Sequence, residues 1–407
     1  MSEMSYLEKL LDGVEVEWKS LGEIATKIYS GGTPDTKRIE YWENGTIPWM
    51  SSGEVNLKNI ERTEKYITEA GLNNSSAKLV PRNSVVIALA GQGKTRGKVA
   101  RIRIALATNQ SLAALTFDEK KFSSDYVFHF LETQYESLRQ ISSGNSGRGG
   151  LNLQMISAYK IPIPCPGNPE KSLAIQSEIV RILDKFTELT AELTAELTAE
   201  LSMRKKQYNY YRDQLLNFKE DEVEGKRKTL GEIMKMRAGQ HISAHNIIER
   251  KEESYIYPCF GGNGIRGYVK EKSHDGEHLL IGRQGALCGN VQRMKGQFYA
   301  TEHAVVVSVM PGINIDWAFH MLTAMNLNQY ASKSAQPGLA VGKLQELKLF
   351  VPSIERQIYI AAILDKFDTL TNSITEGLPR EIELRQKQYE YYRDLLFSFP
   401  KPETVSN

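Results

Sequence analysis

The chain has 407 residues, which predicts two or three domains at roughly 150 residues per domain. Lys and Arg number 51 against 49 Asp and Glu, so a formal net charge of +2 does not by itself indicate a nucleic-acid-binding protein. Its cysteines, Cys165, Cys259 and Cys288, form no CxxC pair, which excludes a disulfide framework and a cysteine-rich zinc module. The sequence has no apolar run of membrane-spanning length, and its acidic start is unlike a secretory signal, so we expect a cytoplasmic protein.

In chain order, the pattern predicts an N-terminal helical segment at 1–18, a variable domain at 19–165 and a long helix at 170–220. A second variable domain follows at 226–352, and a second long helix at 353–400. The variable domains are rich in β-branched residues and glycine, which predicts strands at 85–93, 98–107, 278–285 and 303–310. We expect one helix in each variable domain, at 125–141 and 316–331.

Self-comparison shows that the chain contains an internal repeat. The run SLAIQSEIVRILDKF at 172–186 returns as SIERQIYIAAILDKF at 353–367, and RKKQYNYYRDQLLNF at 204–218 returns as RQKQYEYYRDLLFSF at 385–399. Both pairs share an offset of 181 residues, so the two long units have equal length. Weaker echoes pair KSLGEI with KTLGEI and ALATNQSLAAL with FYATEHAVVV. The chain therefore alternates a variable domain with a repeated helical unit, twice.

Each repeated unit is predicted to be a helix of roughly 70 Å, at 1.5 Å per residue. Apolar residues recur every three or four positions, which favours two helices packed along each other; in the first unit the stripe includes Leu189, Leu193, Leu197 and Leu201. The last three of these leucines end three tandem TAEL units within 187–201. In the second unit Gly377 and Pro379 predict a break, with Pro379 placed in a new first turn.

The strongest indication of an enzyme is AGQGKT, in which Gly93, Lys94 and Thr95 follow an apolar strand. A phosphate-binding loop needs a helix next, whereas the following RGKVARIRIALA predicts another strand. A glycine-rich turn between strands is the better interpretation. An NTPase that uses Lys94 remains a rival, as does a structural scaffold, in which paired coiled coils join two protein-binding modules.

Charge distribution indicates two basic faces, one in each variable domain. Between Glu69 and Asp118 the chain has no acid and seven Lys or Arg residues, and the second domain has acid-free stretches at 278–301 and 317–345. Glycine-containing loops in both domains carry the Arg, Lys, Asn and Gln side chains that read bases. The candidate DNA-binding residues are Lys27, Ser30, Thr33, Lys94, Arg96, Lys98, Arg101, Asn145, Arg148, Asn263, Arg266, Arg283, Gln284, Lys333, Gln336 and Lys343.

This layout resembles the specificity subunit of type I restriction-modification systems, and the TAEL tandem resembles the type IC subclass. The resemblance rests on the ILDKF and QKQYxYYRD-like runs, the LGEI motif, and the domain borders KIPIP and LFVP. It implies an α+β fold, with two similar α/β target recognition domains separated by two long antiparallel helices that form a coiled coil with pseudo-two-fold symmetry.

The resemblance also implies a function: a non-catalytic subunit that reads double-stranded DNA. Each recognition domain would read one half of a bipartite asymmetric target, and the helices would set the spacer. Two methyltransferase (modification) subunits would flip adenines out for methylation, and restriction/translocase subunits would translocate and cleave DNA. The chain itself is expected to bind no cofactor and no membrane; S-adenosylmethionine, ATP and Mg²⁺ are expected on the partner subunits.

Overall fold

The computed structural model describes residues 10–11, 13–91, 95–142, 150–217, 223–285, 287–332, 337–372 and 376–400. The chain divides into two compact units. One boundary lies between Thr194 and Ala195, within the long helix α7 (Pro169–Leu216), and the other between Glu383 and Leu384, within α12 (Gly377–Leu396). Unit 1 contains the residues before the first boundary and after the second, and unit 2 contains the residues between them.

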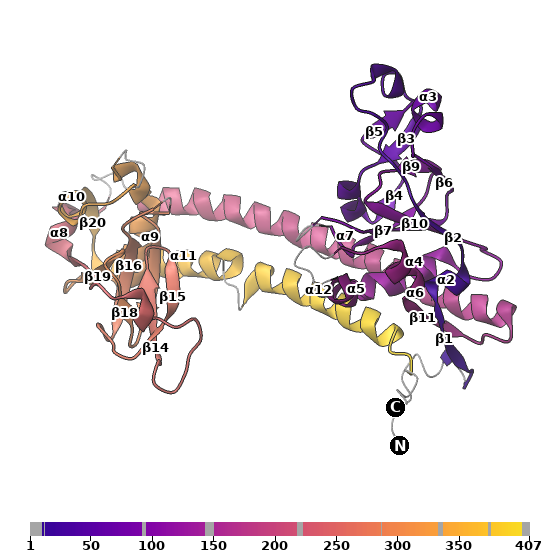
Figure 1. Cartoon of the computed structure of the whole chain (residues 1–407). Coiled ribbons are helices and arrows are strands. Elements are labelled where there is room, and N and C mark those ends of the chain that lie inside the picture. Colours follow the sequence, from indigo (N-terminus) through magenta and orange to yellow (C-terminus); the bar gives the residue numbers. More distant parts are fainter. Residues whose placement is uncertain are drawn as a thin grey trace. The chain divides into compact units, whose positions relative to one another are not determined.

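Unit 1 is built on a five-stranded sheet in the order β2-β10-β7-β8-β4 (Figure 1). These strands are Ala25–Ser30, Leu112–Phe117, Ser84–Ala88, Val99–Ile102 and Asn59–Ile60. A four-stranded sheet has the order β5-β3-β9-β6, formed by Lys65–Ile67, Ile47–Met50, Leu106–Thr108 and Leu79–Val80. A separate ribbon pairs β1 (Val16–Ser20) with β11 (Lys160–Pro164).

The central strand β7 is apolar from Val85 to Ala88, as expected of a strand whose two faces are both buried. Val85 and Ile87 pack into a core with the helices, whereas Val86 and Ala88 pack into a second core on the opposite face. The described helices of unit 1 are α2 (Leu21–Ile24), α3 (Glu69–Asn73), α4 (Ser124–Thr133), α5 (Tyr135–Ser142), α6 (Leu153–Ala158), the first part of α7 and the last part of α12, with 3-10 turns at Ile39–Tyr41 and Ser52–Leu57.

Unit 2 repeats this plan with a four-stranded sheet in the order β13-β19-β16-β17. Its strands are Met234–Ala238, Ala304–Val309, Glu277–Gly282 and Val291–Lys295. A three-stranded sheet joins β15 (Gly264–Val269), β14 (Tyr257–Gly261) and β18 (Tyr299–Ala300), and β12 (Gly225–Thr229) pairs with β20 (Lys348–Pro352). The helices are α8 (Leu230–Ile233), α9 (Ile315–Ala324), α10 (Val341–Gln345), α11 (Ile354–Asn372) and parts of α7 and α12, with 3-10 turns at Ala244–Asn246 and Leu327–Tyr330.

Small local signals recur in both units. The LGEI motif forms α2 and α8, and each begins with a capping box, Ser20 with Glu23 and Thr229 with Glu232. The border motifs KIPIP and KLFVP form the strands β11 and β20. The structure thus confirms the duplicated α+β organisation.

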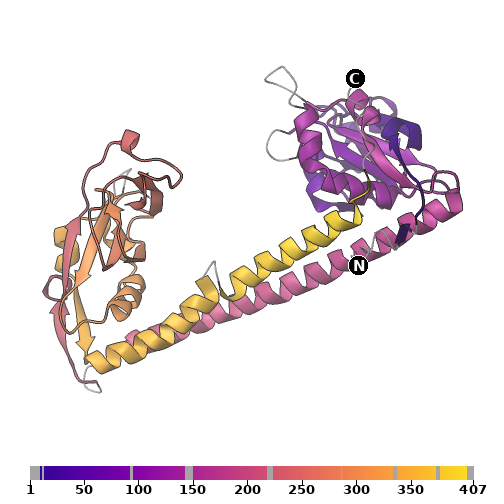
Figure 2. The ribbon, with the colours of Figure 1, turned by 90° about the horizontal axis from the view of Figure 1, so that it is seen from below.

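The repeated helices pack against each other in an antiparallel sense within each unit. In unit 1, Leu183 in the first half of α7 shares a core with Leu396 at the end of α12. Figure 2 shows these two helices side by side. In unit 2, Leu216 at the end of α7 shares a core with Ile360 near the start of α11.

The expected break in the second helix is confirmed: α11 ends at Asn372 and α12 begins at Gly377. Gly377 has φ +79°, and a Cβ there would lie 2.6 Å from the carbonyl oxygen of Thr369, so other residues fit poorly. Pro379 falls in the first turn of α12, where a helix needs no donor.

Three expectations need correction. Val16–Ser20 form strand β1, so the end of the helical segment expected at 1–18 is wrong; most of that segment lies outside the described residues. The helix expected at 125–141 is two helices, because Gln134 leaves the helical conformation and caps α4. The helix expected at 316–331 stops at Ala324, because Asn326 is left-handed with φ +47°.

None of the helices that the structure describes has the length and apolar character to cross a membrane.

Candidate nucleic-acid interface

At one end of the main sheet of unit 1, backbone hydrogen bonds join loops that are distant in sequence. The amide of Gly32 donates to the carbonyl of Thr108 (2.9 Å), and that of Leu89 to Ser111 (2.8 Å). The amide of Leu151 donates to the carbonyl of Leu89 (3.1 Å). We call this surface, made by residues 30–33, 89–91, 95–98, 109–111 and 150–151, the loop edge of unit 1.

Unit 2 builds an equivalent edge from the same kinds of bonds. The amide of Arg283 donates to the carbonyl of His303 (2.8 Å), that of Leu339 to Arg283 (2.9 Å), and that of Gln240 to Ala300 (2.9 Å). The loop edge of unit 2 comprises residues 239–241, 283–285, 287–290, 302–303 and 338–339. Its backbone plan is therefore that of unit 1.

Glycine allows the first loop of each edge to approach the sheet closely. A Cβ at Gly31 would overlap the carbonyl oxygen of Thr108, and one at Gly239 would overlap that of Ala300. This contact holds the neighbouring side chains, Thr33 in unit 1 and His241 in unit 2, beside the sheet end.

The side chains on the two edges differ. In unit 1, Thr33 Oγ1 donates to Gln110 Oε1 (2.6 Å), and Asn109 Oδ1 accepts from the backbone of Ser111 (3.1 Å). Uncharged amides and hydroxyls of this kind donate to and accept from base edges. The edge of unit 1 therefore combines neutral polar side chains with two basic ones, Arg96 and Lys98.

In unit 2 the corresponding positions carry ionisable groups. His303 Nδ1 is hydrogen-bonded to Gln284 Oε1 (2.6 Å), and His241 Nδ1 to Glu302 Oε1 (2.9 Å). Burial alone would raise the pKa of Glu302, but the hydrogen bond from His241 and the charge of His303 bring it below its ordinary value. Unit 2 thus presents a carboxylate acceptor where the equivalent position of unit 1 carries the amide of Gln110.

Most of the described candidates that the sequence indicated lie at these edges. Ser30, Thr33, Arg96 and Lys98 belong to the edge of unit 1, and Arg283 and Gln284 to that of unit 2. Asn263, at the turn between β14 and β15, joins the second edge because Asn290 Nδ2 donates to its Oδ1 (3.1 Å). The candidates outside the described residues are Lys94, Asn145, Arg148, Lys333 and Gln336.

Four described candidates lie elsewhere: Arg266, Lys343, Lys27 and, on β8, Arg101. Arg266 is in β15 and exposed, and its side chain covers Gly261. Lys343 is exposed on the short helix α10. Lys27, on β2, lines a cavity of about 770 Å³ with Lys78, and no acidic residue lines that cavity. The Lys78 ammonium lies 5.9 Å from the ring centroid of Tyr29. This basic groove suits a phosphate backbone.

Arg101 is the candidate whose surroundings do not fit DNA binding. Its side chain is only 10% exposed, and it forms ion pairs with Asp184 (2.8 Å) and Asp125 (3.4 Å). Arg103 also binds Asp125, at 3.0 Å. In unit 2, Lys295 pairs with Glu277 at 2.8 Å. Because acids from elsewhere in the chain pair with these cations, the acid-free stretches are less basic in the folded chain than in the sequence. Arg101 is therefore not one of the proposed DNA contacts.

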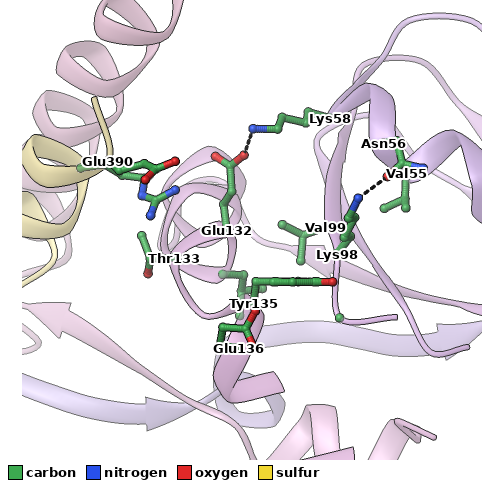
Figure 3. Close-up of a pocket in the computed structure, with 13 residues that line it drawn as sticks. Val55, Asn56, Lys58, Lys98, Val99, Glu132, Thr133, Tyr135, Glu136 and Glu390 are labelled. Carbon is green, nitrogen blue, oxygen red and sulfur yellow. Dashed lines mark hydrogen bonds and ion pairs between the residues drawn. The ribbon is translucent and has the colours of Figure 1, made fainter. Parts of the chain in front are cut away.

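Lys98 lines a cavity of about 490 Å³ in unit 1, where its ammonium donates to Asn56 Oδ1 at 2.6 Å (Figure 3). Lys58 forms an ion pair with Glu132 in the same cavity. Glu136 and Glu390 add two more carboxylates, while Arg393 is the remaining cation. Because this lining is mixed in charge, the cavity does not suit a nucleotide phosphate.

The loop that contains Lys94 leads into a strand and not into the helix that a phosphate-binding loop needs. The loop joins β7 to the antiparallel strand β8, so a strand follows it as the sequence indicates. Within the described part of the chain, His, Cys, Asp and Glu side chains form no group of three that would hold a metal ion.

Several edge residues were not among the candidates. Asn109, Gln110, Glu302 and His303 lie in the echo between ALATNQSLAAL and FYATEHAVVV, which locates them in both units. The repeated motif itself could have located these residues. In each unit it begins with a short strand, and its polar residues lie just before the next strand, β10 or β19. His241 and Asn290 belong to the edge of unit 2 through hydrogen bonds to Glu302 and Asn263, which form only when the chain folds.

Comparison with known proteins identifies the class. Residues 13–203 and 222–384 match the family described as type I restriction modification DNA specificity domain. The chain is 68% identical over 381 residues to the specificity subunit of the type I restriction enzyme EcoprrI of Escherichia coli, covering 92% of this chain and 93% of that protein. It is 43% identical to the EcoR124I/EcoR124II specificity subunit of E. coli, over 100% of both chains.

Solved structures agree on the fold. A chain from a study of complex assembly and conformational transition of the type I R-M system has a TM-score of 0.66 at 13% identity, covering 94% of this chain and 97% of that one. The HsdS subunit from Thermoanaerobacter tengcongensis has a TM-score of 0.55 at 15% identity, covering 94% and 96%.

The protein belongs to the family of type I restriction-modification specificity subunits. It is the subunit of such a complex that determines DNA target recognition, and it is similar to the type IC members EcoprrI and EcoR124I. Members of this family are non-catalytic and bind no cofactor themselves.

Proposed function

We propose that each loop edge reads one half of a bipartite, asymmetric target in double-stranded DNA, and that the repeated helices set the distance between the halves. Two modification subunits would use this frame to methylate adenines with S-adenosylmethionine, and restriction/translocase subunits would act on the same complex with ATP and Mg²⁺.

The observation that carries the proposal is one backbone plan, built twice, with different side chains on it. Gln110 and Ser111 occupy the places that Glu302 and His303 occupy in unit 2, since Leu89 bonds to Ser111 as Arg283 bonds to His303. A carboxylate accepts from cytosine N4, whereas Asn and Gln pair with adenine. Two different edges should therefore favour two different half-sites.

Phosphate contacts would come from cations next to the edges. We include Lys27 with its groove neighbour Lys78, and Arg96 and Lys98 at the edge of unit 1. Arg266, Arg283 and Lys343 are the described cations proposed in unit 2. The remaining proposed contacts, outside the described residues, are Lys94, Asn145, Arg148, Lys333 and Gln336. Because several Lys and Arg side chains would contact phosphates, the affinity for DNA should fall steeply as the salt concentration rises.

Methylation mapping tests the proposal. The chain is expressed with its modification subunits, and methylated adenines are mapped across the host genome. The expected motif has two dissimilar halves with one gap. Gln110→Ala should relax one half and Gln284→Ala the other, because each side chain lies on a different edge.

Lys235→Ala, an exposed change on β13, serves as the control and should leave both halves unchanged. The proposal fails if a single undivided motif is methylated, or if both glutamine variants relax the same half.

A further inference from the structure

One polar cluster, in which the side chains of His129 and Arg101 are buried and that of Asp184 is partly exposed, joins the recognition domain of unit 1 to its repeated helix. On α7, Asp184 Oδ1 accepts a hydrogen bond from His129 Nε2 of α4 (2.9 Å), and the carboxylate also pairs with Arg101 of β8 (2.8 Å). Arg101 reaches back to Asp125 in the first turn of α4 (3.4 Å). His129 has a side chain only 2% exposed. A strand, a helix of the domain and the long helix therefore meet at one carboxylate.

Unit 2 contains the same cluster. On α11, Asp365 Oδ1 accepts from His320 Nε2 of α9 (2.8 Å) and pairs with Arg293 of β17. Arg293 also lies 3.6 Å from Asp316, in the first turn of α9. Asp184 and Asp365 are the aspartates of the two ILDKF runs. The domains around them differ in sequence, so the recurrence of the same residue type at all four positions indicates a shared role.

A second polar contact accompanies each cluster, two turns earlier on the helix. Gln176 Oε1 accepts from the backbone amide of Ser123, the N-cap residue of α4 (2.9 Å). Gln357 Oε1 accepts from that of Asn314, the N-cap residue of α9 (2.8 Å). Both glutamines are fully buried. We call Gln176 with the Asp184 cluster, and Gln357 with the Asp365 cluster, the two anchors.

Between the polar contacts of each anchor the packing is apolar. Ile179 and Leu183 lie there in unit 1, and Ile360 and Leu364 in unit 2, all of them buried. Apolar contacts tolerate small shifts and rotations, because burial has no direction. A buried hydrogen bond or ion pair is directional, and a misplaced partner would leave a buried polar group unsatisfied. The anchors therefore fix one position of the domain helix on the long helix.

We propose that the anchors position the two readers: by fixing α4 on α7 and α9 on α11, they set where each loop edge stands along and around its helix, and so restrict the complex to one gap between half-sites. The proposal rests on the proposed function, since it assigns the accuracy of the spacing to these residues. Asp184, Gln176, Asp365 and Gln357 are positioning residues and do not touch DNA.

The test compares Asp184→Asn and Asp365→Asn with the wild-type chain, each assembled with modification subunits. The substrates are duplexes with the mapped half-sites and gaps of the natural length, one base pair shorter and one base pair longer. Each variant should raise the methylation of the wrong-gap duplexes relative to the natural one by about tenfold, as loss of one hydrogen bond to a charged group implies. The half-site sequences should not change.

Lys185→Gln and Lys366→Gln are matched controls, because each is the exposed neighbour of an anchor aspartate. Their gap ratio should equal that of the wild type. A purely structural role would lower methylation of all duplexes equally and leave the ratio unchanged, which would overturn the proposal. Should one aspartate variant fail to fold, the other and Gln176→Ala still measure the ratio.

A wild-type chain without any gap preference would refute the proposed function, and the role of the anchors with it. A selective wild type with equally selective aspartate variants would refute only the role of the anchors.

Discussion

The ring of Phe186 stacks on the ring of Tyr392, with their centroids 5.6 Å apart and their planes inclined by 26°. In unit 2 the ring of Phe367 stacks on that of Tyr211, at 5.5 Å and 27°. The phenylalanines end the two ILDKF runs, and the tyrosines belong to the two YYRD runs. Each unit thus pairs the ILDKF end of one repeated helix with the YYRD end of the other, which is the pseudo-two-fold relation expected of an antiparallel pair.

We predict that Phe186→Ala weakens this helix pairing by about 1–2 kcal/mol. The aromatic contact and part of the buried ring surface are lost, and the ring is 36% exposed in the native chain. Urea unfolding of the full chain measures the effect. Met203→Ala, on an exposed position of the same α7 helix, is the control. Equal effects of both substitutions would contradict a stabilising role for the stacked pair.

The internal repeat made the architecture predictable, because two 47-residue units at one offset predict two similar long helices, each preceded by a variable domain. Charge was less predictable. Arg101 and Arg103 stand in an acid-free stretch, yet Asp125 and Asp184 neutralise them from 22 to 83 residues away. Counting charges along a sequence does not include such pairs, because only folding brings them together.

The TAEL tandem shows a second limit of the sequence pattern. Leu189 and Leu193 were expected on the packed stripe, but they are 42% and 40% exposed. Thr187 and Thr190 are less exposed, and Thr187 Oγ1 lies 3.1 Å from the hydroxyl of Tyr389. Leucines four apart advance about 40° beyond a full turn at each step, so they do not stay on one face.

Tyr208 and Tyr389 are equivalent in the repeat but differ in partners, which predicts unequal effects of removing their hydroxyls. Tyr208 Oη donates to His320 Nδ1 (3.3 Å), whereas Tyr389 contacts Thr187, whose hydroxyl still donates to Leu183 (2.7 Å). Tyr208→Phe should cost about 1 kcal/mol, because it leaves a buried nitrogen without a donor. Tyr389→Phe should cost less in the same urea unfolding measurement, and the reverse order would contradict this assignment.

The lowered pKa of Asp184 predicts that the folded chain loses stability in acid. Burial alone would raise its pKa, but the hydrogen bonds from His129 and Arg101 and the charge of Arg101 lower it from 3.8 to about 2. A carboxyl with a lowered pKa in the folded state stabilises the fold above pH 3.8, and this contribution disappears as the pH falls toward 2. Unfolding midpoints of the wild type should therefore fall more steeply over this range than those of Asp184→Asn. Parallel curves would show that the anchor does not hold the carboxylate ionised.

The position of Lys27 in the basic groove predicts that replacing it changes the salt dependence of DNA binding. If its ammonium neutralises one phosphate from the basic groove, Lys27→Ala should weaken binding to all sequences alike and reduce the slope of log affinity against log salt by about 1. Anisotropy titrations of labelled DNA at several NaCl concentrations measure this slope. Lys121→Ala, an exposed lysine that does not line the groove, should leave the slope unchanged. A wild-type slope in Lys27→Ala would remove this residue from the DNA contacts.

The TAEL tandem predicts that the gap depends on the length of α7. Deleting one unit, residues 194–197, removes four residues from a continuous helix, which shortens it by about 6 Å and rotates its far end by about 40°. One base pair corresponds to about 3.4 Å of rise and roughly 35° of twist, so the preferred gap should shrink by about one to two base pairs. Methylation mapping of the deletion chain measures the gap directly. Glu196→Gln, which keeps the length of the helix, should keep the original gap. Because the deletion removes no residue of either loop edge, both half-sites should stay the same, and altered half-sites with an unchanged gap would contradict the role of the helices as a spacer.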